Sequence, residues 1–257
     1  MELAKEVTKK QAKQELATKQ TNLPSVNYAN DPLNEATSTD IIIPKLLLMH
    51  GLSKLVAAGK KNQGDMIKSD DETTLAKRGE SIHIVPLSFS KSWRISEVVP
   101  GQQNKWKGEI PRNASNDDLP WDDVVDGKAI KRDRAYNFYA MICKDMDAGT
   151  AFPIRLQFLR TSSKAGQILA DHFAKSKMFN KDAKAQTFTI TSESETKENK
   201  TFLKFSLTPS AATTPKHLEQ CTEWAQMLAK NIDKIKDHDT DNEGEEAAPV
   251  TATKDEF

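Results

Sequence analysis

The stretch "FPIRLQFLRTSSKAGQILADHF", residues 152–173, decides the fold, because within it a strand pattern changes into a helix pattern. In its first part apolar and polar side chains alternate, which predicts a half-buried strand with Arg155 and Gln157 on the polar face. Thr161 or Ser162 can then cap a helix, and the residues that follow carry an apolar stripe at helical spacing. The stretch therefore predicts a strand followed directly by an amphipathic helix.

Further strand patterns lie on both sides of this stretch. Residues 81–99 read as one long bent strand or as a hairpin, and residues 100–128 as a long loop rich in Gly, Pro, Asn and Asp. Three more segments have the period-two pattern of half-buried strands: 136–143, 186–192 and 201–208. A second amphipathic helix is predicted over residues 214–235.

The predicted order is strand, strand, strand, helix, strand, strand, with a helix after it. This is the succession of the OB-fold, a small Greek-key barrel that often binds oligonucleotides or oligosaccharides. We therefore expect a mainly β protein: an OB-fold-like five-stranded barrel, with a helix between strands 3 and 4, a C-terminal helix and disordered termini. Several all-β and α+β folds share this count of elements and stay open as alternatives.

Composition divides the chain into three parts. Residues 1–39 are polar, which predicts a disordered N-terminal segment. Residues 40–236 hold the predicted strands and helices and form the expected binding domain. They begin with the apolar "DIIIPKLLLMHGLSKLV", residues 40–56, which we expect to cover part of the barrel, with docking of a partner as the alternative. Residues 237–257 are acidic, which predicts a disordered C-terminal tail.

Charge is divided unevenly although the formal net charge is zero. Residues 237–257 hold eight acids and one base, a balance of −7, so residues 1–236 carry +7. Residues 128–184 hold twelve bases and five acids, which is also an excess of +7. We expect these bases to line one continuous trough for a polyanion, while the tail recruits a partner or masks the trough.

The sequence contains no recognisable catalytic or metal-binding motif. The five histidines do not lie at metal-ligand spacing, and the motifs of zinc proteases, redox thiols and serine hydrolases are missing. "DDLPWDDVVD", residues 117–126, does not match a calcium-binding loop and reads as a solvated acidic loop. We expect no metal, no cofactor and no enzymatic activity, with an enzyme whose site is dispersed along the sequence as the last alternative.

Composition also predicts the compartment. The chain has no apolar run long enough to span a membrane, and its start does not resemble a signal peptide. Cys143 and Cys221 show no pairing pattern, which is typical of a reduced protein. We expect a cytoplasmic protein without a membrane partner.

Cations and aromatic rings occur together on the predicted strands. Binding of single-stranded nucleic acid needs cations along the phosphates and flat rings on which bases stack. The candidate contact residues are Lys91, Trp93, Arg94, Trp106, Lys131, Arg132, Arg134, Tyr139, Arg155, Arg160, Lys164, Phe202 and Lys204. For Trp93, a core position is an equally good interpretation, since its strand alternation also places it with Ile95.

Two parts of the chain resemble single-stranded DNA-binding proteins encoded by bacteriophages. The first is the stretch quoted above with "TFTITSESETKENKTFLKFSL" (187–207), within a similar region of about 40–208; the second is the acidic end "KDEF". The resemblance implies an OB-fold that coats single strands during replication and recombination. It also implies that Asp255, Glu256 and Phe257 dock on replication or repair proteins. The proline that precedes the final Phe in the bacterial relatives is missing here, so the resemblance does not identify the partner.

Two other functions remain open. A scaffold or assembly factor would use the acidic tail and bind only proteins. An OB-fold that binds RNA would use the same rings and cations on a different polynucleotide. A homo-oligomer is compatible with each of these predictions, and a phage-encoded protein would work in the host cytoplasm.

Overall fold

The computed structural model describes residues 41–101, 104–197, 200–231 and 236–237. The predicted N-terminal segment, 1–39, and residues 238–257 of the predicted acidic tail lie outside the described residues. All described strands and helices belong to one structural unit, Ser38–Phe257. Among the described residues, no helix is long and apolar enough to cross a membrane.

The protein is built mainly from antiparallel strands, as predicted. Its main sheet has seven strands, in the order β11 (Lys200–Ala212), β10 (Gln186–Lys197), β5 (Ser81–Glu97), β8 (Lys128–Ile142) and β7 (Asp122–Val125), with β6 (Lys105–Pro111) on β5 and β9 (Ile154–Phe158) on β8. Among the described residues, no strand pairing joins β9 to β11. The sheet is therefore open, and the expected closed barrel is wrong.

The predicted order of the long strands is confirmed. β5, β8 and β9 precede helix α4 (Ser163–Met178), and β10 and β11 follow it. β5 is a single strand that shifts register against β8 between Pro86 and Ser88, so of the two alternatives for residues 81–99 the long strand is the one found. The long loop predicted for residues 100–128 is wrong, because β6 and β7 form within it.

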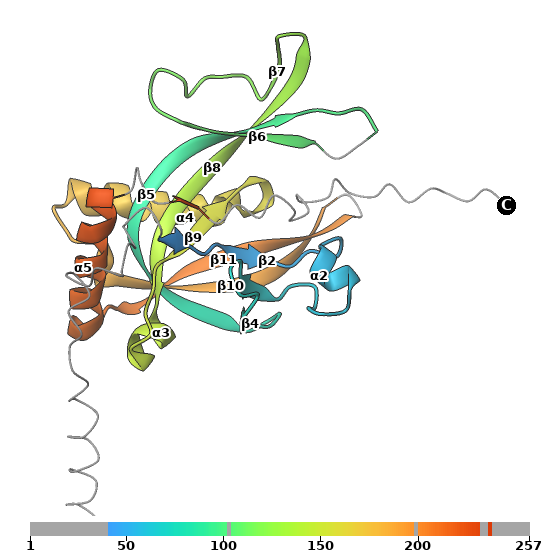
Figure 1. Cartoon of the computed structure of the whole chain (residues 1–257). Helices are drawn as coiled ribbons and strands as arrows, with labels where there is room; N and C mark the ends of the chain where they lie inside the picture. Colours follow the sequence, from blue (N-terminus) through green and yellow to red (C-terminus); the bar gives the residue numbers. More distant parts are fainter. Residues whose placement is uncertain (1–40, 102–103, 198–199, 232–235, 238–257) are drawn as a thin grey trace, which may run out of the picture. The chain divides into compact units, whose positions relative to one another are not determined.

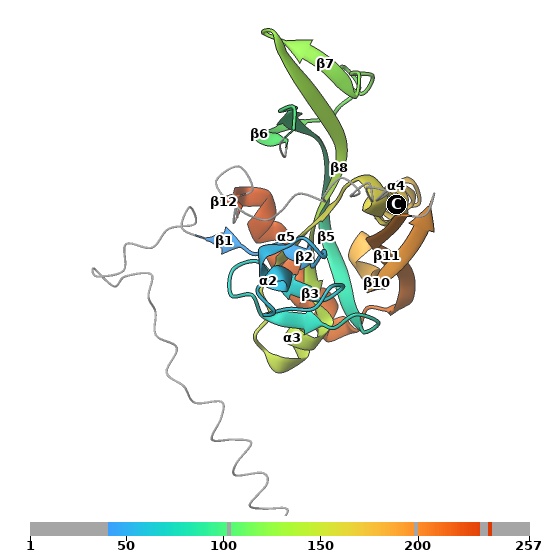
Figure 2. The ribbon, with the colours of Figure 1, turned by 90° about the vertical axis from the view of Figure 1, so that its right-hand side faces the viewer.

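One half of the β5–β8 hairpin extends beyond the rest of the sheet (Figures 1 and 2). β10 pairs with the beginning of β5 and β9 with the end of β8, whereas β6 and β7 pair with the opposite halves of these two strands. We call this four-stranded extension the arm. It consists of β6, β7, residues 92–97 of β5 and residues 128–135 of β8.

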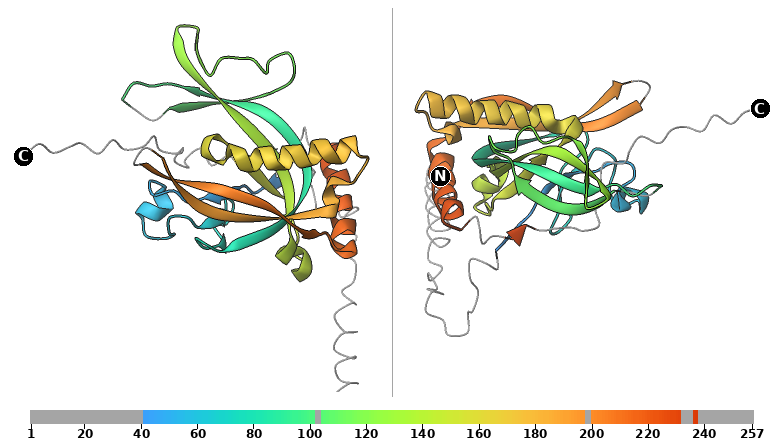
Figure 3. Two further views of the ribbon diagram at one scale, coloured as in Figure 1. Left: turned by 180° about the vertical axis from the view of Figure 1, so that it is seen from behind. Right: turned by 90° about the horizontal axis from the view of Figure 1, so that it is seen from above.

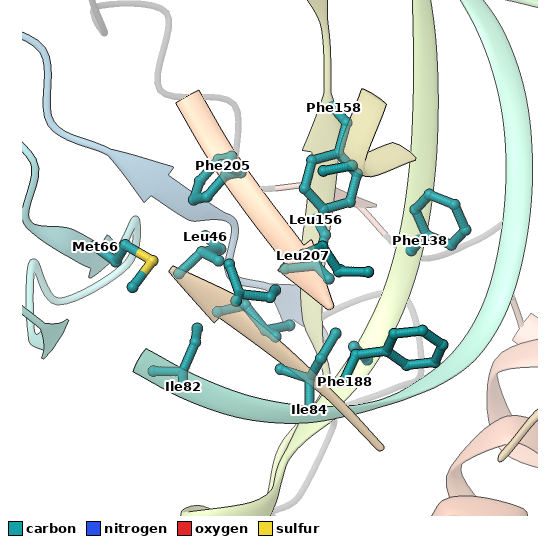
Figure 4. Packing of buried hydrophobic residues seen from close by; sticks show 14 of the residues in the cluster. Leu46, Met66, Ile82, Ile84, Phe138, Leu156, Phe158, Phe188, Phe205 and Leu207 are labelled. Atoms are coloured by element: carbon teal, nitrogen blue, oxygen red, sulfur yellow. The ribbon is translucent and has the colours of Figure 1, made fainter. Parts of the chain in front are cut away.

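The larger core lies on one face of the main sheet, which we call the inner face. Rings and aliphatic side chains from five strands meet there, among them Phe138, Phe158, Phe188 and Phe205 (Figure 4). α4 covers this face (Figure 3). A Cβ atom at Gly166 would lie 2.7 Å from that of Tyr136, so only glycine allows the helix to come this close.

A small three-stranded sheet completes the inner core. It consists of β2 (Leu46–Leu48), β3 (Met66–Lys68) and β4 (Thr74–Ala76), after which the chain enters β5. β2 contacts both β9 and β11, the two strands that do not pair with each other, and buries Leu46 and Leu48 in the core. Part of the segment 40–56 therefore covers the sheet, as expected, although the sheet is not a closed barrel.

A second apolar cluster lies on the opposite face, at the end of the sheet far from the arm. Helix α5 (Pro215–Asn231) and helix α3 (Cys143–Ala148) pack there against Val85, Leu87 and Met141. β1 (Ile42–Ile43) pairs in parallel with β12 (Lys236–Asp237). Both cysteines are free thiols. The short helices are α2 (Lys54–Ala57), η3 (Arg160–Ser162) and η4 (Ala183–Ala185).

Candidate nucleic-acid interface

Strand alternation gives the β5–β8 hairpin a second, polar face. We call it the outer face, because it points away from the core that α4 covers. It carries Ser92, Arg94, Trp106, Glu109, Lys131, Asp133, Asn137, Tyr139, Arg155 and Gln157. The helices α3 and α5 pack on one end of this face, against an apolar cluster that also includes Tyr139.

The strand register brings five of the predicted contact residues onto this outer face. Ser96 lies opposite both Lys131 and Trp106, and Tyr139 lies opposite Arg155. The fifth, Arg94, lies between Glu109 and Asp133. Arg160 in η3 reaches the same face, since its Nη2 donates to Asp133 at 2.7 Å. Two rings and four cations predicted from the sequence thus lie together on the outer face.

Glu109 stands at the centre of a hydrogen-bonded network on the outer face. Its Oε2 accepts from Ser92 Oγ at 2.8 Å and from Arg155 Nη2 at 3.3 Å. Its Oε1 accepts from Gln157 Nε2 at 2.6 Å. Asn137 closes the network: its Oδ1 accepts from Gln157 at 2.9 Å and from Arg155 at 3.2 Å, and its Nδ2 donates to Ser92 at 2.8 Å.

The network is largely shielded from water. Ser92, Asn137 and Arg155 are buried, and Glu109 and Gln157 are half-buried. At its border, burial raises the pKa of the Tyr139 phenol, an effect that nearby Glu109 strengthens and Arg155 opposes. Tyr139 is therefore harder to ionise than an exposed tyrosine.

At least four of the nine predicted cations are paired with carboxylates. Arg155 pairs with Glu109 and Arg160 with Asp133 on the outer face. Arg132 pairs with Asp123 in the arm, and Lys204 pairs with Glu195 on β11. A paired cation in a shielded position is a weaker phosphate contact, because binding the phosphate would mean breaking the existing pair.

The expected continuous trough of cations is wrong. Lys131 lies on the outer face, but Arg132 and Arg134 lie on the inner face of the arm, because neighbouring strand residues point to opposite sides. Lys144 is on α3, and Lys175 is near the end of α4, away from both faces of the arm. The excess positive charge of residues 128–184 is therefore distributed over several surfaces.

Trp93 is a further correction. Its side chain is 0% exposed, so it offers no face to a base, and the core interpretation is right. The guanidinium carbons of Arg112 and Arg134 each lie 5.5 Å from its ring centre. Its Nε1 donates to the carbonyl oxygen of Asn116 at 2.9 Å. Trp93 and Arg134 are structural parts of the arm, which removes both from the candidate contacts.

The remaining predicted residues lie apart from the outer face of the arm. Lys91 is exposed on the inner face, and Lys164 is exposed near the start of α4. Phe202 and Lys204 are half-buried on the side of β11 that faces away from the core. The predicted partner-binding residues Asp255, Glu256 and Phe257 lie outside the described residues.

The sequence contained signals for residues that the prediction did not include. In "SFSKSWRIS", residues 88–96, serine occupies every outer-face position of β5 except that of Arg94. This period-two row of small polar side chains marks a polar face, and Ser92 joins the network. Glu109 had no such signal, because it lies in the segment that was predicted as a loop.

At least two of the five aspartates of residues 117–126 have ion-pair partners. Asp117 pairs with Arg112, and Asp123 pairs with Arg132. Within the part of the chain that the structure describes, no three His, Cys, Asp or Glu side chains come together as a metal site.

Known proteins give no independent guide to this site. Comparison of the chain with protein-family models, with curated proteins and with solved structures finds no match.

Proposed function

We propose that this chain is a non-enzymatic single-stranded DNA-binding protein of the phage type, which coats strands during replication, recombination or repair in the host cytoplasm. The observation that carries the proposal is the outer face of β8 and β9, where two rings and four cations surround a hydrogen-bonded network. OB-folds bind oligonucleotides on the face of their second and third strands. The five strands predicted from the sequence correspond to β5, β8, β9, β10 and β11, so β8 and β9 come second and third among them.

Trp106 and Tyr139 would supply the stacking surfaces. Trp106 is 38% exposed in the arm, and Tyr139 is half-buried near the other end of the polar surface. Stacking of a base on an aromatic ring contributes about 1–3 kcal/mol and tolerates any base. Arg94 lies between the levels of these rings along β5, and Lys131 lies level with Trp106 on β8, from where it can approach the phosphates. This arrangement suits a single strand better than a duplex, whose bases are already stacked.

The direct test is binding of a fluorescent oligo-dT strand, measured by anisotropy over a series of salt concentrations. Affinity should fall with salt at a log–log slope of about 0.7 for each phosphate that is neutralised. No binding, or binding that salt does not change, would contradict the proposal. Competition with an RNA strand of matched sequence separates the DNA-binding function from the RNA-binding one, because the 2′-hydroxyl is the distinguishing group.

The acidic tail is proposed to recruit replication or recombination proteins and to compete with DNA between encounters. Phe257 would fill an apolar pocket on the partner, while Asp255 and Glu256 meet basic residues at its rim. Deletion of residues 238–257 keeps β12 and should leave DNA binding equal or tighter, with recruitment lost. Weaker DNA binding by this variant would contradict the masking role.

A protein-binding scaffold is the second candidate, and the arm gives it support. Six of the ten exposed large apolar side chains among the described residues belong to the arm or its loops: Val98, Trp106, Ile110, Trp121, Val124 and Val125. Exposed apolar patches often mark protein interfaces. A scaffold should purify without a nucleic-acid absorbance signature and should not bind oligo-dT.

A further inference from the structure

We infer that the centre of the outer face contacts the bases of a bound strand and keeps the phosphates away, with Glu109 as the positioning residue. This inference rests on the proposed function, because it says how the same face would orient its ligand. It differs from the expectation that Arg155 and Arg160 neutralise phosphates.

The charged side chains at the centre form ion pairs with each other. Glu109 pairs with Arg155 at 3.3 Å, and Asp133 pairs with Arg160 at 2.7 Å. Asp133 and Arg155 are both buried, so neither pair is strongly screened by solvent. A phosphate placed here would meet two carboxylates as well as two guanidinium groups, and it would gain little net attraction.

The hydrogen-bonding groups at the centre point to the same conclusion. Both amide hydrogens of Gln157 have acceptors, since its Nε2 donates to Glu109 and to Asn137. The group that Gln157 keeps for a ligand is therefore its carbonyl oxygen. Glu109 offers only acceptors, and the Asn137 amide is engaged by Ser92, Gln157 and Arg155.

The centre is thus rich in acceptors, because Glu109 already accepts hydrogen bonds from Ser92, Arg155 and Gln157. A phosphate oxygen can only accept, so it would have to compete with Glu109, Asn137 and Asp133 for the donors of Arg155 and Arg160. The N–H groups on base edges are donors and do find acceptors there. A strand would lie with its bases on Gln157 and Glu109 and with its phosphates toward the flanks, where Lys131 is located.

The test compares oligo-dT with an abasic sugar–phosphate strand of equal length, by anisotropy over a series of salt concentrations. The native protein should bind oligo-dT at least about tenfold more tightly, since the abasic strand can neither stack nor donate from a base. Glu109→Gln releases Arg155 and Gln157 for phosphates. This variant should gain affinity for the abasic strand and steepen its salt slope by about 0.7.

Asp122→Asn is the matched control, because it removes a carboxylate from the same face of the arm, opposite Lys131 and outside the network. It should leave the ratio of oligo-dT to abasic affinity unchanged. Equal binding of both strands by the native protein, or the same shift in both variants, would overturn the inference while leaving the proposed function standing. Failure to bind either strand would overturn both.

A second variant covers the case in which Glu109→Gln does not fold. Arg155→Gln keeps amide donors near Glu109 and removes the cation. If Arg155 touches no phosphate, the salt slope for oligo-dT stays as in the native protein. A slope that falls by about 0.7 would show that Arg155 neutralises a phosphate, and the inference would fail. Lys131→Gln should show that decrease and serves as the positive control.

Discussion

The two halves of the β5–β8 hairpin hold their inner faces together in different ways. Toward β9 and β10, Phe138 packs among Phe89, Phe158 and Phe173 in an apolar core. On the inner face of the arm and of the residues next to it, rings and guanidinium groups stack alternately. Tyr136, Arg112, Trp93, Arg134 and Trp121 follow one another at 5.2 to 5.6 Å. One pair of strands thus passes from apolar packing to cation–ring packing.

This difference in packing shows how the arm stays ordered without an apolar core of its own. A cation over an aromatic ring contributes about 0.5–2 kcal/mol, which is less than a fully buried ring contributes in a core. Three buried guanidinium nitrogens, Arg112 Nη1, Arg132 Nε and Arg134 Nε, also lack a hydrogen-bond partner in the described structure, whereas Arg112 Nε pairs with Asp117. We therefore expect the arm to open at a lower free energy than the core.

The largest expected effect comes from the core. Phe138→Ala removes a ring that is 0% exposed, and the resulting cavity should lower the free energy of unfolding by about 3–5 kcal/mol. Chemical denaturation measures this loss. Val124→Ala, at a position 67% exposed in the arm, is the control and should change stability by less than about 0.5 kcal/mol. A similar loss in both variants would remove the contrast between the two regions.

The next effect concerns the arm. Trp93→Leu keeps an apolar side chain but loses two cation–ring contacts and the hydrogen bond to Asn116. We expect a loss of roughly 1–2 kcal/mol. Hydrogen exchange should rise first at amides of residues 92–97 and 128–135, while amides around Phe138 keep their protection. Uniform loss of protection over both regions would mean that the arm and the core open together.

The thiol of Cys221, in the second apolar cluster, provides another test of whether the arm opens separately from the core. Burial raises the pKa of Cys221 to about 12, so almost no thiolate forms at neutral pH. Alkylation of Cys221 should therefore follow global unfolding and stay slow in Trp93→Leu, in which only the arm loosens. Fast alkylation in that variant would show that the arm and the α5 cluster are coupled. Phe138→Ala should accelerate the reaction.

The smallest effect is a change with pH at the tip of the arm. A hydrogen bond from Arg132 lowers the pKa of Asp123 below its ordinary value of 3.8. The pair therefore stabilises the folded arm fully above about pH 4, and this contribution disappears as pH falls through the lowered pKa. Trp121 fluorescence should report the change in acid, and Asp123→Asn should abolish it. An unchanged titration in that variant would assign the signal to another carboxyl group.

The predictable part of the fold was the part with a single buried face. The strand from 152 to 160 alternates apolar and polar side chains, and β9 with its inward Leu156 was found there. β6 and β7 were missed because Gly108, Pro111 and the run of aspartates read as turn signals. Closure of the sheet could not be predicted, because it depends on which distant strands pair.

The candidate site, like the fold, was predictable only in part. Alternation correctly placed Arg155 and Gln157 on the side opposite the core. The partner of Arg155, Glu109, is 46 residues away, and only the registers of β6 and β9 bring the two together. Trp93 was ambiguous for a similar reason, since the loop after Arg112 that encloses it leaves no signal in the local pattern.

The central claim, that the outer face and not the inner face of the arm holds a single strand, is tested most directly by tryptophan fluorescence. Trp106 lies on the outer face and Trp121, 49% exposed, on the inner face. Oligo-dT titrations should quench the native protein and the Trp121→Phe variant alike, while Trp106→Phe loses most of the quenching. Quenching that survives in Trp106→Phe and disappears in Trp121→Phe would place the strand on the other face and contradict the account.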